Sequence, residues 1–537
     1  MSIYSYKKQK PTDQYDTIVI GSGPGGLCAA ALLAKEGQKV LVLERHYTPG
    51  GYTHVFKRND YEWDVGIHYL GEVNRPGTFL DALMTYITDK PLEWADMGEV
   101  YDRIRIDEEE FHFVKGVKNF AAKLKTYFPE EAEAIDRYFA LIKEAGDASR
   151  NFFTEKALPP FLASLFGGFL RKKYSKFTKR TTMEVLQELT SNKKLIAVLC
   201  GQYGDYGLPP SQGSFAMHAV LVKHYLSGAC YPVGGASVIA PAIAGVIAAA
   251  GGAVYTNADV QEVVLEGRKA VGVKMADGRV LKAKTIISGT GYINTYHKLF
   301  SAANIEKFNL KNQLPTCGPS ASHMSLYIGF QQTAEQLGLP KANYWLYKGD
   351  DHDAAVANFL ADPKNAEFPV VYVSYPSAKD PDFLNRYPGR ATMEIVTIAP
   401  FDLFAEWADE RWKKRGDDYE ALKEHFAQRL LKRLYEVHPE LEGKIAYYEL
   451  STPVSTQHFC NYETGEIYGL SHSPERFQIR HLKPQTPIKN FYMTGQDIVS
   501  CGFGGALAGG LLTASRLCGA KISKKLVALA KSRKASR

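Results

Sequence analysis

Three glycines near the start of the chain, Gly21, Gly23 and Gly26, have the spacing G-x-G-x-x-G. In such a turn the first glycine permits a tight bend, the second lets the backbone approach a pyrophosphate, and the third lets a helix pack closely on a strand. Ser22 and Gly25 complete the turn, and a helix that follows it would present free N–H groups to phosphates. The turn therefore predicts dinucleotide binding.

An acidic residue and a second glycine pair follow this turn. Glu44 ends the next apolar stretch, where its carboxylate can accept hydrogen bonds from ribose hydroxyls. Arg45 and the pair Gly50-Gly51 supply a second close approach of backbone, as expected where an extended FAD crosses a domain. We therefore predict FAD rather than NAD as the bound nucleotide.

A stretch near the end of the chain suits the flavin half of the same cofactor. The run 491–497 contains Gly495 and Asp497, which can hydrogen-bond the ribityl chain. A glycine-rich helix after Cys501 can aim its N-terminus at the flavin and stabilise negative charge on a reduced ring. Val260 completes the set of predicted FAD-binding residues, and no metal site is predicted.

The elements around the first turn form a recognisable unit. Residues 16–20 predict a short buried strand, 27–36 a helix ended by Gly37, and 39–43 a second strand. This order of strand, glycine turn, helix and strand is one βαβ unit. Residues 254–264, 270–275 and 280–288 predict a small meander, with a hairpin at Asp277-Gly278.

We predict an α/β fold in which a Rossmann-type FAD-binding domain is assembled from discontinuous segments, with an inserted α+β substrate domain. At 537 residues the chain is too long for one ordinary core. The expected parts are FAD-binding segments at 1–75, 229–300 and 485–520, a mostly helical substrate or lid region at 76–228, a substrate domain at 301–484, and a basic tail at 521–537.

Composition excludes several classes of protein. With 45% hydrophobic and 23% charged residues, the chain is typical of a soluble globular enzyme rather than of a disordered or fibrous protein. Seven scattered cysteines without a Cys-x-x-Cys pair argue against a disulfide framework or zinc site and for a reducing compartment. The N-terminus lacks a signal-peptide pattern, so we predict a cytoplasmic protein. Nothing in the sequence resembles a nucleic-acid-binding motif, and no such partner is predicted.

Membrane contact is a further expectation, and it is peripheral. Residues 231–258 and 498–515 are long enough to span a bilayer, but their glycine and alanine content favours helices buried in the protein. The apolar run 158–170 precedes a basic block at 171–180. This pair of segments fits either a monotopic membrane-contact element or a core helix of the substrate domain followed by a solvated face.

Four stretches resemble the phytoene desaturase, carotenoid isomerase and retinol saturase group of flavoproteins, and the retinol saturases most closely. They are residues 15–51, 61–73 (YEWDVGIHYLGEV), 229–244 (ACYPVGGASVIAPAIA) and 491–512. The resemblance implies non-covalent FAD and a long apolar tunnel for a polyene or lipid, reached from a membrane surface. It also implies saturation, desaturation or cis–trans isomerisation of carbon–carbon double bonds, of which saturation is the leading hypothesis.

Saturation of an alkene needs a hydride from the flavin on one carbon and a proton on the other, so a protein acid is expected across the double bond. His68 lies in a segment similar to the flavin-contacting stretch of that group, and Tyr231 precedes a Pro-x-Gly-Gly turn. These two are the predicted catalytic residues, although each can equally be a hydrogen-bonded structural side chain. His218 and His224, shortly upstream of Tyr231, stay open as further candidates.

The electron donor stays open, because no second G-x-G-x-x-G indicates a site for NAD or NADP. Carotenoid isomerase or phytoene-type desaturase activity is the alternative within the group. A flavin amine oxidase shares the same cofactor frame but would need a polar aromatic cage. A non-catalytic prenyl-lipid carrier, as in the Rab escort group, would not need a working FAD site.

Overall fold

A parallel sheet of six strands forms the centre of the cofactor domain in the computed structural model, which describes residues 2–12 and 14–535. The strand order is β1-β11-β3-β2-β15-β21, and every neighbouring pair is parallel. The strands are β1 (Ile3–Ser5), β2 (Thr17–Ile20), β3 (Val40–Leu43), β11 (Ala253–Thr256), β15 (Thr285–Ser288) and β21 (Phe491–Met493). The prediction of a Rossmann-type domain built from discontinuous segments is confirmed.

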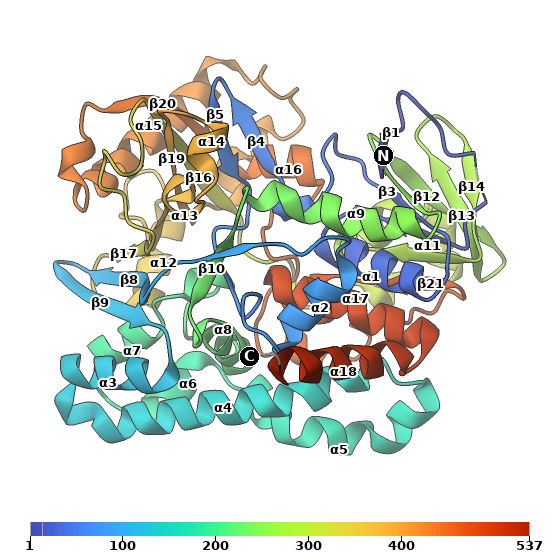
Figure 1. Ribbon diagram of the computed structural model, residues 1–537, viewed down its shortest axis with the longest axis horizontal. Coiled ribbons are helices and arrows are strands. Elements are labelled where there is room, and N and C mark those ends of the chain that lie inside the picture. Colours follow the sequence, from blue (N-terminus) through green and yellow to red (C-terminus); the bar gives the residue numbers. More distant parts are fainter. Residues whose placement is uncertain (1, 13, 536–537) are drawn as a thin grey trace.

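Helices cover this sheet (Figure 1). The helix α1 (Pro24–Lys35) follows the glycine turn and packs against α17 (Gly502–Cys518) and α9 (Ile239–Ala249). Small residues allow the close contact of α1 with α17, because a Cβ added at Gly510 would lie 2.7 Å from the Cβ of Cys28. Segments from the two ends of the chain therefore share one core.

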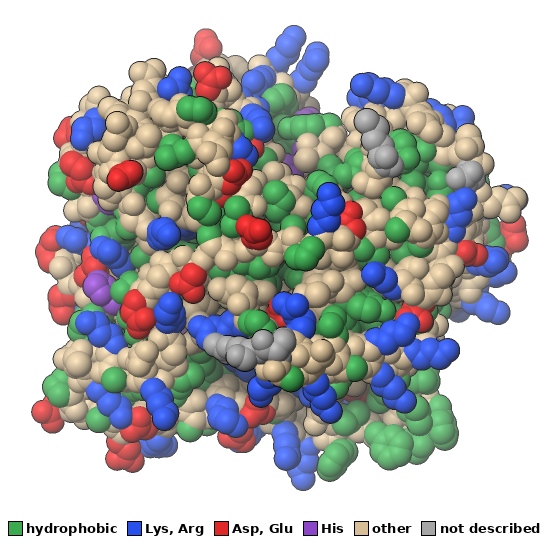
Figure 2. All heavy atoms as spheres, in the orientation of Figure 1, with side chains coloured by type: hydrophobic (Ala, Val, Ile, Leu, Met, Phe, Trp, Pro, Cys, Tyr) green, Lys and Arg blue, Asp and Glu red, His purple; other side chains and the backbone are tan. Residues whose placement is uncertain are grey.

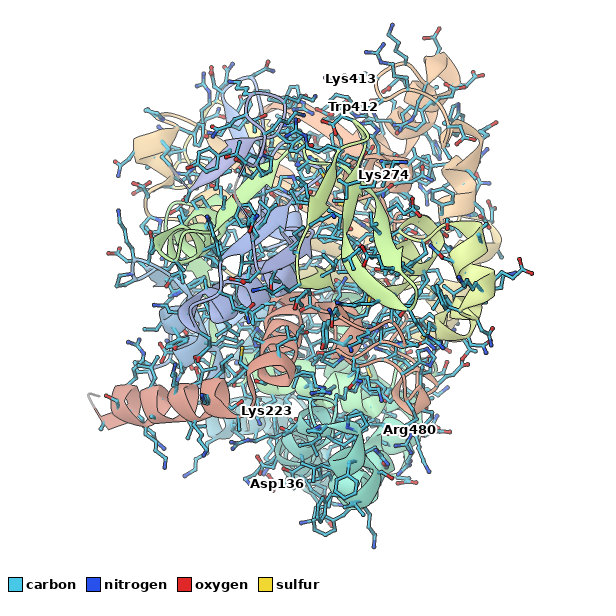
Figure 3. The ribbon with its side chains drawn as sticks, turned by 90° about the vertical axis from the view of Figure 1, so that its right-hand side faces the viewer. Asp136, Lys223, Lys274, Trp412, Lys413 and Arg480 are labelled. Atoms are coloured by element: carbon cyan, nitrogen blue, oxygen red, sulfur yellow. The ribbon has the colours of Figure 1, made fainter. Side chains whose placement is uncertain are left out.

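The meander next to the parallel sheet has three strands, β12 (Val260–Glu266), β13 (Lys269–Met275) and β14 (Val280–Lys282). Figure 3 shows it from the side, with Lys274 labelled on β13. The prediction that residues 254–264 form one strand of this meander was wrong. The backbone turns at Asn257, where φ is +52°, so that β11 joins the parallel sheet and β12 starts the meander.

A mixed sheet of seven strands, named the substrate sheet because most of it lies in the segment predicted to bind substrate, has the order β20-β16-β19-β18-β17-β8-β9. Its strands are β8 (Val100–Ile106), β9 (Glu109–Val114), β16 (His323–Phe330), β17 (Asn343–Tyr347), β18 (Val371–Ser374), β19 (Ala391–Ile398) and β20 (Ile445–Ser451). The strands β8 and β9 lie in a segment expected to be mostly helical, and the parallel pairing of β8 with β17 joins that segment to this sheet.

Shorter strands and the remaining helices complete the fold. The short strands are β4 (Val55–Arg58), β5 (Tyr61–Asp64), β6 (Leu70–Gly71), β7 (Trp94–Asp96) and β10 (Ala229–Pro232). One group of helices packs beneath β8 and β9: α3 (Val117–Tyr127), α4 (Ala132–Glu155), α5 (Pro160–Thr178), α6 (Thr182–Gln187), α7 (Lys193–Leu199) and α8 (Phe215–Tyr225). The others are α2 (Phe79–Ile87), α10 (Tyr292–Lys298), α11 (Ala302–Lys307), α12 (His352–Ala361), α13 (Pro376–Lys379), α14 (Phe383–Arg386), α15 (Gly416–Tyr435), α16 (Pro453–Cys460) and α18 (Lys521–Ala535).

The basic tail is helical over its described part. The helix α18 packs against α2, and the guanidinium of Arg533 contacts the carboxylate of Asp81 at 2.6 Å. Figure 3 shows α18 extending from the side of the molecule beside the helical region that carries Lys223. The tail therefore has a defined place against the cofactor domain.

The apolar run at 158–170 lies mostly in α5, and its large side chains face outward. Phe161 is 71% exposed and Phe169 is 78% exposed, and Leu162, Leu165 and Phe166 are exposed as well. In Figure 2 hydrophobic side chains gather at the lower right, where Figure 1 places α5. This face of α5 is not part of a core. Within residues 2–12 and 14–535, none of the helices has the length and apolar character needed to cross a bilayer.

Candidate active site

A cavity of about 1240 Å³ connects the glycine turn, the N-terminus of α17 and one face of the substrate sheet. Most small-molecule sites have volumes of roughly 300–1,000 Å³, so the space suits a large cofactor together with a substrate. One end of the cavity is lined by Lys223 of α8 and by residues of α4 and α18, including Arg150 and Lys534. The cavity therefore extends from the cofactor domain to the surface region near α18.

The three motif glycines have different surroundings. A Cβ at Gly26 would lie 2.2 Å from the carbonyl oxygen of Gly21, so this glycine permits the packing of α1 on β2. A Cβ at Gly25 would lie 2.4 Å from the Cα of Gly495, so this position permits the closing turn to approach. A Cβ at Gly23 would meet no atom within 4 Å, because Gly23 borders the cavity. The open space lies beside the N-terminus of α1, where a pyrophosphate fits.

Glu44 lines the cavity at the end of β3 and is held by its neighbours. Its Oε2 accepts hydrogen bonds from the backbone N–H and hydroxyl of Ser22, at 2.8 and 2.7 Å, and its Oε1 accepts one from the N–H of His46. The Ser22 hydroxyl also accepts the N–H of Gly50 at 3.0 Å. Ser22 thus connects the turn, the acid and the second glycine pair, and Glu44 keeps lone pairs for a ribose hydroxyl.

The remaining predicted cofactor residues divide into cavity walls and supports. Arg45, Gly51, Val260 and Gly495 line the cavity. Arg45 is oriented by two hydrogen bonds from its guanidinium to the carbonyl groups of His458 and Phe459. Asp497 is buried, and its two oxygens accept the N–H groups of Leu470 and Tyr292 at 3.0 and 2.8 Å.

Asp497 therefore holds the closing turn in place and has its hydrogen bonds inside the protein. After this turn, Gly502, Gly504 and Gly505 at the N-terminus of α17 also line the cavity. Two helix N-termini thus border one space, which fits a cofactor with a pyrophosphate at one end and an electron-accepting ring at the other. That Arg45, Val260 or Asp497 contacts the nucleotide directly stays a prediction.

His68 lines the cavity and lies against a buried carboxyl group. Its Nδ1 is 2.6 Å from Oε2 of Glu394, and the two side chains are 15% and 0% exposed. The backbone N–H of Asp64 donates to Oε1 of Glu394 at 2.6 Å. One imidazole nitrogen of His68 and one carboxyl oxygen each of Asp64 and Glu394 all lie within 4.8 Å of one another. The cavity wall therefore contains an imidazole with two buried carboxyl groups beside it.

Tyr231 lies behind this cluster. Its hydroxyl donates to Oδ2 of Asp64, and its side chain is buried. Among the described residues, His68 belongs to the cavity wall and Tyr231 does not. This position gives Tyr231 contact with the acid pair rather than with the cavity, so its role as proton donor stays a prediction that the geometry does not favour.

Burial shifts the pKa values of the whole cluster. Desolvation raises the pKa of Asp64 to about 8, with a further contribution from the nearby charge of Glu394. Desolvation also raises the pKa of Glu394 to about 8 and lowers the pKa of His68 to about 4. At neutral pH the imidazole is therefore neutral and the acid pair retains protons.

Lys379 supplies the positive charge beside this cluster. Its ammonium donates to the backbone carbonyl of His68 at 2.9 Å, to the hydroxyl of Ser374 at 2.7 Å and to the amide oxygen of Asn343. Burial lowers its pKa to about 8. The ammonium fixes the backbone beneath His68 and attracts the carboxyl groups of Asp64 and Glu394.

Aromatic rings form the wall of the cavity beyond His68. Tyr69 and Tyr225 are stacked with centroids 4.4 Å apart, and Trp345 contacts Tyr372 at 4.5 Å. The hydroxyl of Tyr69 lies 3.0 Å from both Asp102 and Asp205, and burial raises the pKa of Asp205 to about 8. This wall presents flat apolar faces with acids at one edge.

His218 and His224 lie on α8, at separate positions. The His218 ring is buried against the hydroxyl of Tyr138 at 2.8 Å, and it is not among the described residues that line the cavity. The Nε2 of His224 accepts the N–H of Gly71 at 2.8 Å, and this side chain borders the cavity near its outer end. Neither residue is part of the His68 cluster.

Sequence reasoning missed Asp64, Glu394 and Lys379. A signal was present at Glu394, because a lone acid interrupts the apolar strand at 391–398. A buried carboxylate in such a strand needs a partner and often marks a functional site. Asp64 lies in the stretch 61–73 that also contains His68, but only the fold brings it to Glu394.

The comparisons with known proteins cover almost the whole chain. Residues 24–518 match the family model described as flavin containing amine oxidoreductase. The all-trans-retinol 13,14-reductase of Danio rerio is 36% identical over 97% of this chain and 88% of the relative. The chloroplastic prolycopene isomerase of Arabidopsis thaliana is 26% identical over 94% of this chain and 84% of the relative.

A solved oxidoreductase from Methanosarcina mazei has a similar fold. Its TM-score is 0.61 at 17% identity, over 92% of this chain and 98% of that structure. At this identity the likeness shows the fold alone.

Proposed function

Because the chain belongs to the flavin containing amine oxidoreductase family, we propose that it is an FAD-dependent reductase of a carbon–carbon double bond in an apolar polyene. FAD is its cofactor, and the enzyme is an oxidoreductase. The observation that carries the proposal is the single cavity, which places an imidazole backed by carboxyl groups in the same space as the two glycine turns. Alkene reduction needs a hydride donor and a proton donor that border the same cavity.

Different residues would bind FAD, hold the substrate and supply the proton. Gly23, Glu44 and the N-termini of α1 and α17 would bind and orient FAD, which when reduced supplies the hydride. The aromatic wall of Tyr69, Tyr225 and Tyr372 would hold a flat conjugated chain and exclude water. His68 would supply the proton to the second carbon, because its ring is the part of the acid cluster that borders the cavity.

An anaerobic experiment tests the proposed activity. The purified protein is reduced with dithionite and mixed in turn with all-trans-retinol, a carotenoid and an unsaturated fatty acid. We expect one polyene to reoxidise the flavin and to gain two hydrogen atoms by mass. An isomerised product without net flavin reoxidation would instead indicate an isomerase, and polyene-dependent reduction of the oxidised enzyme would indicate a desaturase. Trials with NADH and NADPH test the electron donor.

Amine oxidation is the second candidate, favoured by one feature of the cavity. The carboxyl group of Asp205 can accept a hydrogen bond from an ammonium ion, and the aromatic wall can add cation–π contacts. Such an enzyme would release hydrogen peroxide when a diamine such as putrescine is supplied in air. Absence of amine-dependent peroxide, together with polyene-dependent flavin reoxidation, would exclude this candidate.

Membrane contact through α5 is a finer part of the proposal. The exposed side chains of Phe161, Phe166 and Phe169 precede Lys172, Lys173 and Lys176 on the same helix. An apolar face followed by basic residues can enter the headgroup region of an anionic membrane. Because α5 packs on α4, whose residues line the outer end of the cavity, such contact would bring lipid substrates to the opening.

A vesicle-binding assay checks this contact. The substitutions Phe166→Asp and Phe169→Asp together are expected to lower binding to phosphatidylserine vesicles by at least about tenfold, because two aromatic side chains leave the interface and two charges oppose anionic lipid. Leu360→Asp on α12 is the matched control, since Leu360 is also exposed, at 51%. Equal binding by the double variant and the wild type in sedimentation experiments would show that α5 is not the contact.

A further inference from the structure

The contact between His68 and Glu394 is close enough for a proton to pass between the two side chains. Nδ1 of His68 and Oε2 of Glu394 lie 2.6 Å apart, and both atoms are buried without an aligned hydrogen bond in the described structure, so a small turn of the ring would let one proton bridge them. The other oxygen of Glu394 is taken by the N–H of Asp64. One carboxyl oxygen therefore lies against Nδ1 of the ring, and His68 itself lines the cavity.

A count of charges also requires one proton on the pair of carboxyl groups. Two buried carboxyl groups, those of Asp64 and Glu394, face one buried ammonium, that of Lys379. Two negative charges beside one positive charge in a dry site are strongly unfavourable, so one of the two carboxyl groups carries a proton. The Oδ1 atom of Asp64 is buried without a hydrogen-bond partner in the described structure, which leaves it as an acceptor for a proton moving within the pair.

We propose that Glu394 and Asp64 form a carboxyl pair that shares one proton. The pair passes this proton to Nδ1 of His68 as the ring protonates the substrate carbon. This inference rests on the proposed double-bond reductase activity. His68 is the catalytic residue in this scheme, and Glu394, Asp64 and Lys379 are positioning residues that act through it.

The bond changes balance without a charged imidazole. As the alkene gains a hydride from reduced flavin on one carbon, the Nε2–H bond of His68 breaks and a C–H bond forms at the other carbon. At the same time the O–H bond of Glu394 breaks and an Nδ1–H bond forms, so the ring changes tautomer and stays neutral. The new carboxylate is stabilised by the ammonium of Lys379. A proton from solvent and a reductant of the flavin, dithionite in the assay, restore the starting state.

This arrangement explains why burial of the acids is useful. A neutral imidazole is a weak acid in water, and a carboxyl group that passes its proton to Nδ1 avoids forming an imidazolate. Burial raises the pKa of Glu394 and Asp64, so the pair is still protonated at neutral pH. The side chains that face the cluster from neighbouring elements are Lys379 of α13, Tyr231 of β10, His323 and Tyr327 of β16, and Tyr372 of β18, with Asp102 and Asp380 beyond Lys379 and Tyr231.

The pH dependence follows from the same groups. The carboxyl proton is present below the raised pKa of the pair, near pH 8, and is lost above it. The rate of substrate reduction in the wild type should therefore fall as pH rises through this range. In Glu394→Gln, which keeps the shape of the side chain but has no acidic proton, this fall should disappear.

Single-turnover kinetics test the relay. Reduced holoenzyme is mixed anaerobically with the polyene found to be active, and flavin reoxidation is followed. Glu394→Gln and Asp64→Asn are each expected to slow this step by roughly 10- to 100-fold, with FAD content and substrate KM changed less than about threefold. Glu440→Gln is the control, because Glu440 also contacts a buried histidine, His438, at 2.8 Å, but it is 47% exposed and lies outside the cavity.

Infrared spectra of the substrate-free protein give a second readout that needs no turnover. A protonated-carboxyl C=O band that titrates near pH 8 is expected in the wild type and in Glu440→Gln, and it should be reduced in both cluster variants. If the wild type reduces no polyene but shows this band, the proposed activity fails and the shared proton stands. Buried Asp205, whose pKa is also raised to about 8, contributes to this band in every variant. Wild-type rates with an unchanged pH profile in both cluster variants, or a band of undiminished intensity in both, would therefore overturn the relay.

Discussion

Gly23→Val is expected to yield a folded protein without FAD. The backbone at Gly23 has φ −59° and ψ 166°, which any residue can adopt, and a Cβ there meets no atom within 4 Å. The valine side chain would instead fill the space beside the N-terminus of α1 where the pyrophosphate fits. We expect affinity for FAD to fall by at least about 100-fold, or about 2.7 kcal/mol. Flavin absorbance measures the bound cofactor, and circular dichroism measures the fold.

Two other glycines provide the controls for this substitution. Gly168→Val on α5 also enters open space, but away from the cavity, and should leave FAD content unchanged. Gly26→Val should damage the fold itself, since its Cβ would lie 2.2 Å from the carbonyl oxygen of Gly21. Purification of Gly23→Val with a full complement of FAD would show that the nucleotide does not cross the protein at this turn.

His68→Ala is expected to slow substrate-dependent flavin reoxidation by about 10²- to 10⁴-fold, the usual contribution of a positioned general acid. FAD content should stay normal, because the residues proposed to bind the nucleotide are the glycine turns and Glu44, whereas His68 lies against Glu394. Added imidazole should restore part of the rate, because a small acid can enter the space left by the ring. Stopped-flow absorbance of the flavin measures each effect.

A second buried histidine separates this effect from general damage. His438 resembles His68 in burial and in its glutamate partner, but lies outside the cavity. His438→Ala should therefore change stability without changing the rate per bound flavin. A full rate in His68→Ala would assign the proton to another group, and Tyr231 would then be tested in the same way.

The glycine turn, the βαβ unit and the closing segment could be predicted because local sequence determines them. A glycine cluster between an apolar strand and a helix has few other structures available. The partners of Ser22 and Asp497 could not be predicted in the same way. Both side chains bind backbone N–H groups of other loops, and sequence spacing does not reveal which loops meet.

The acid cluster shows the same limit more strongly. Asp64, Lys379 and Glu394 come from β5, α13 and β19, which are far apart in the sequence and contact one another in the folded structure. Pairing across such long stretches of chain depends on tertiary packing, which overrides local preference. The placement of β8 and β9 in the seven-stranded sheet, from a region expected to be mostly helical, has the same cause.

The order of strands in the parallel sheet also constrains how the enzyme is made. Its edge strand β21 pairs with β15, and the turn that follows it packs against the first glycine turn, so the flavin pocket brings together residues as far apart in the chain as Gly25 and Gly495. A nascent chain that has emerged from the ribosome only as far as residue 490 lacks that strand and the helix behind it. We therefore expect FAD to bind only after residues 491–518 have been translated, and until then the incomplete sheet leaves the edge of β15 open to chaperones and to aggregation.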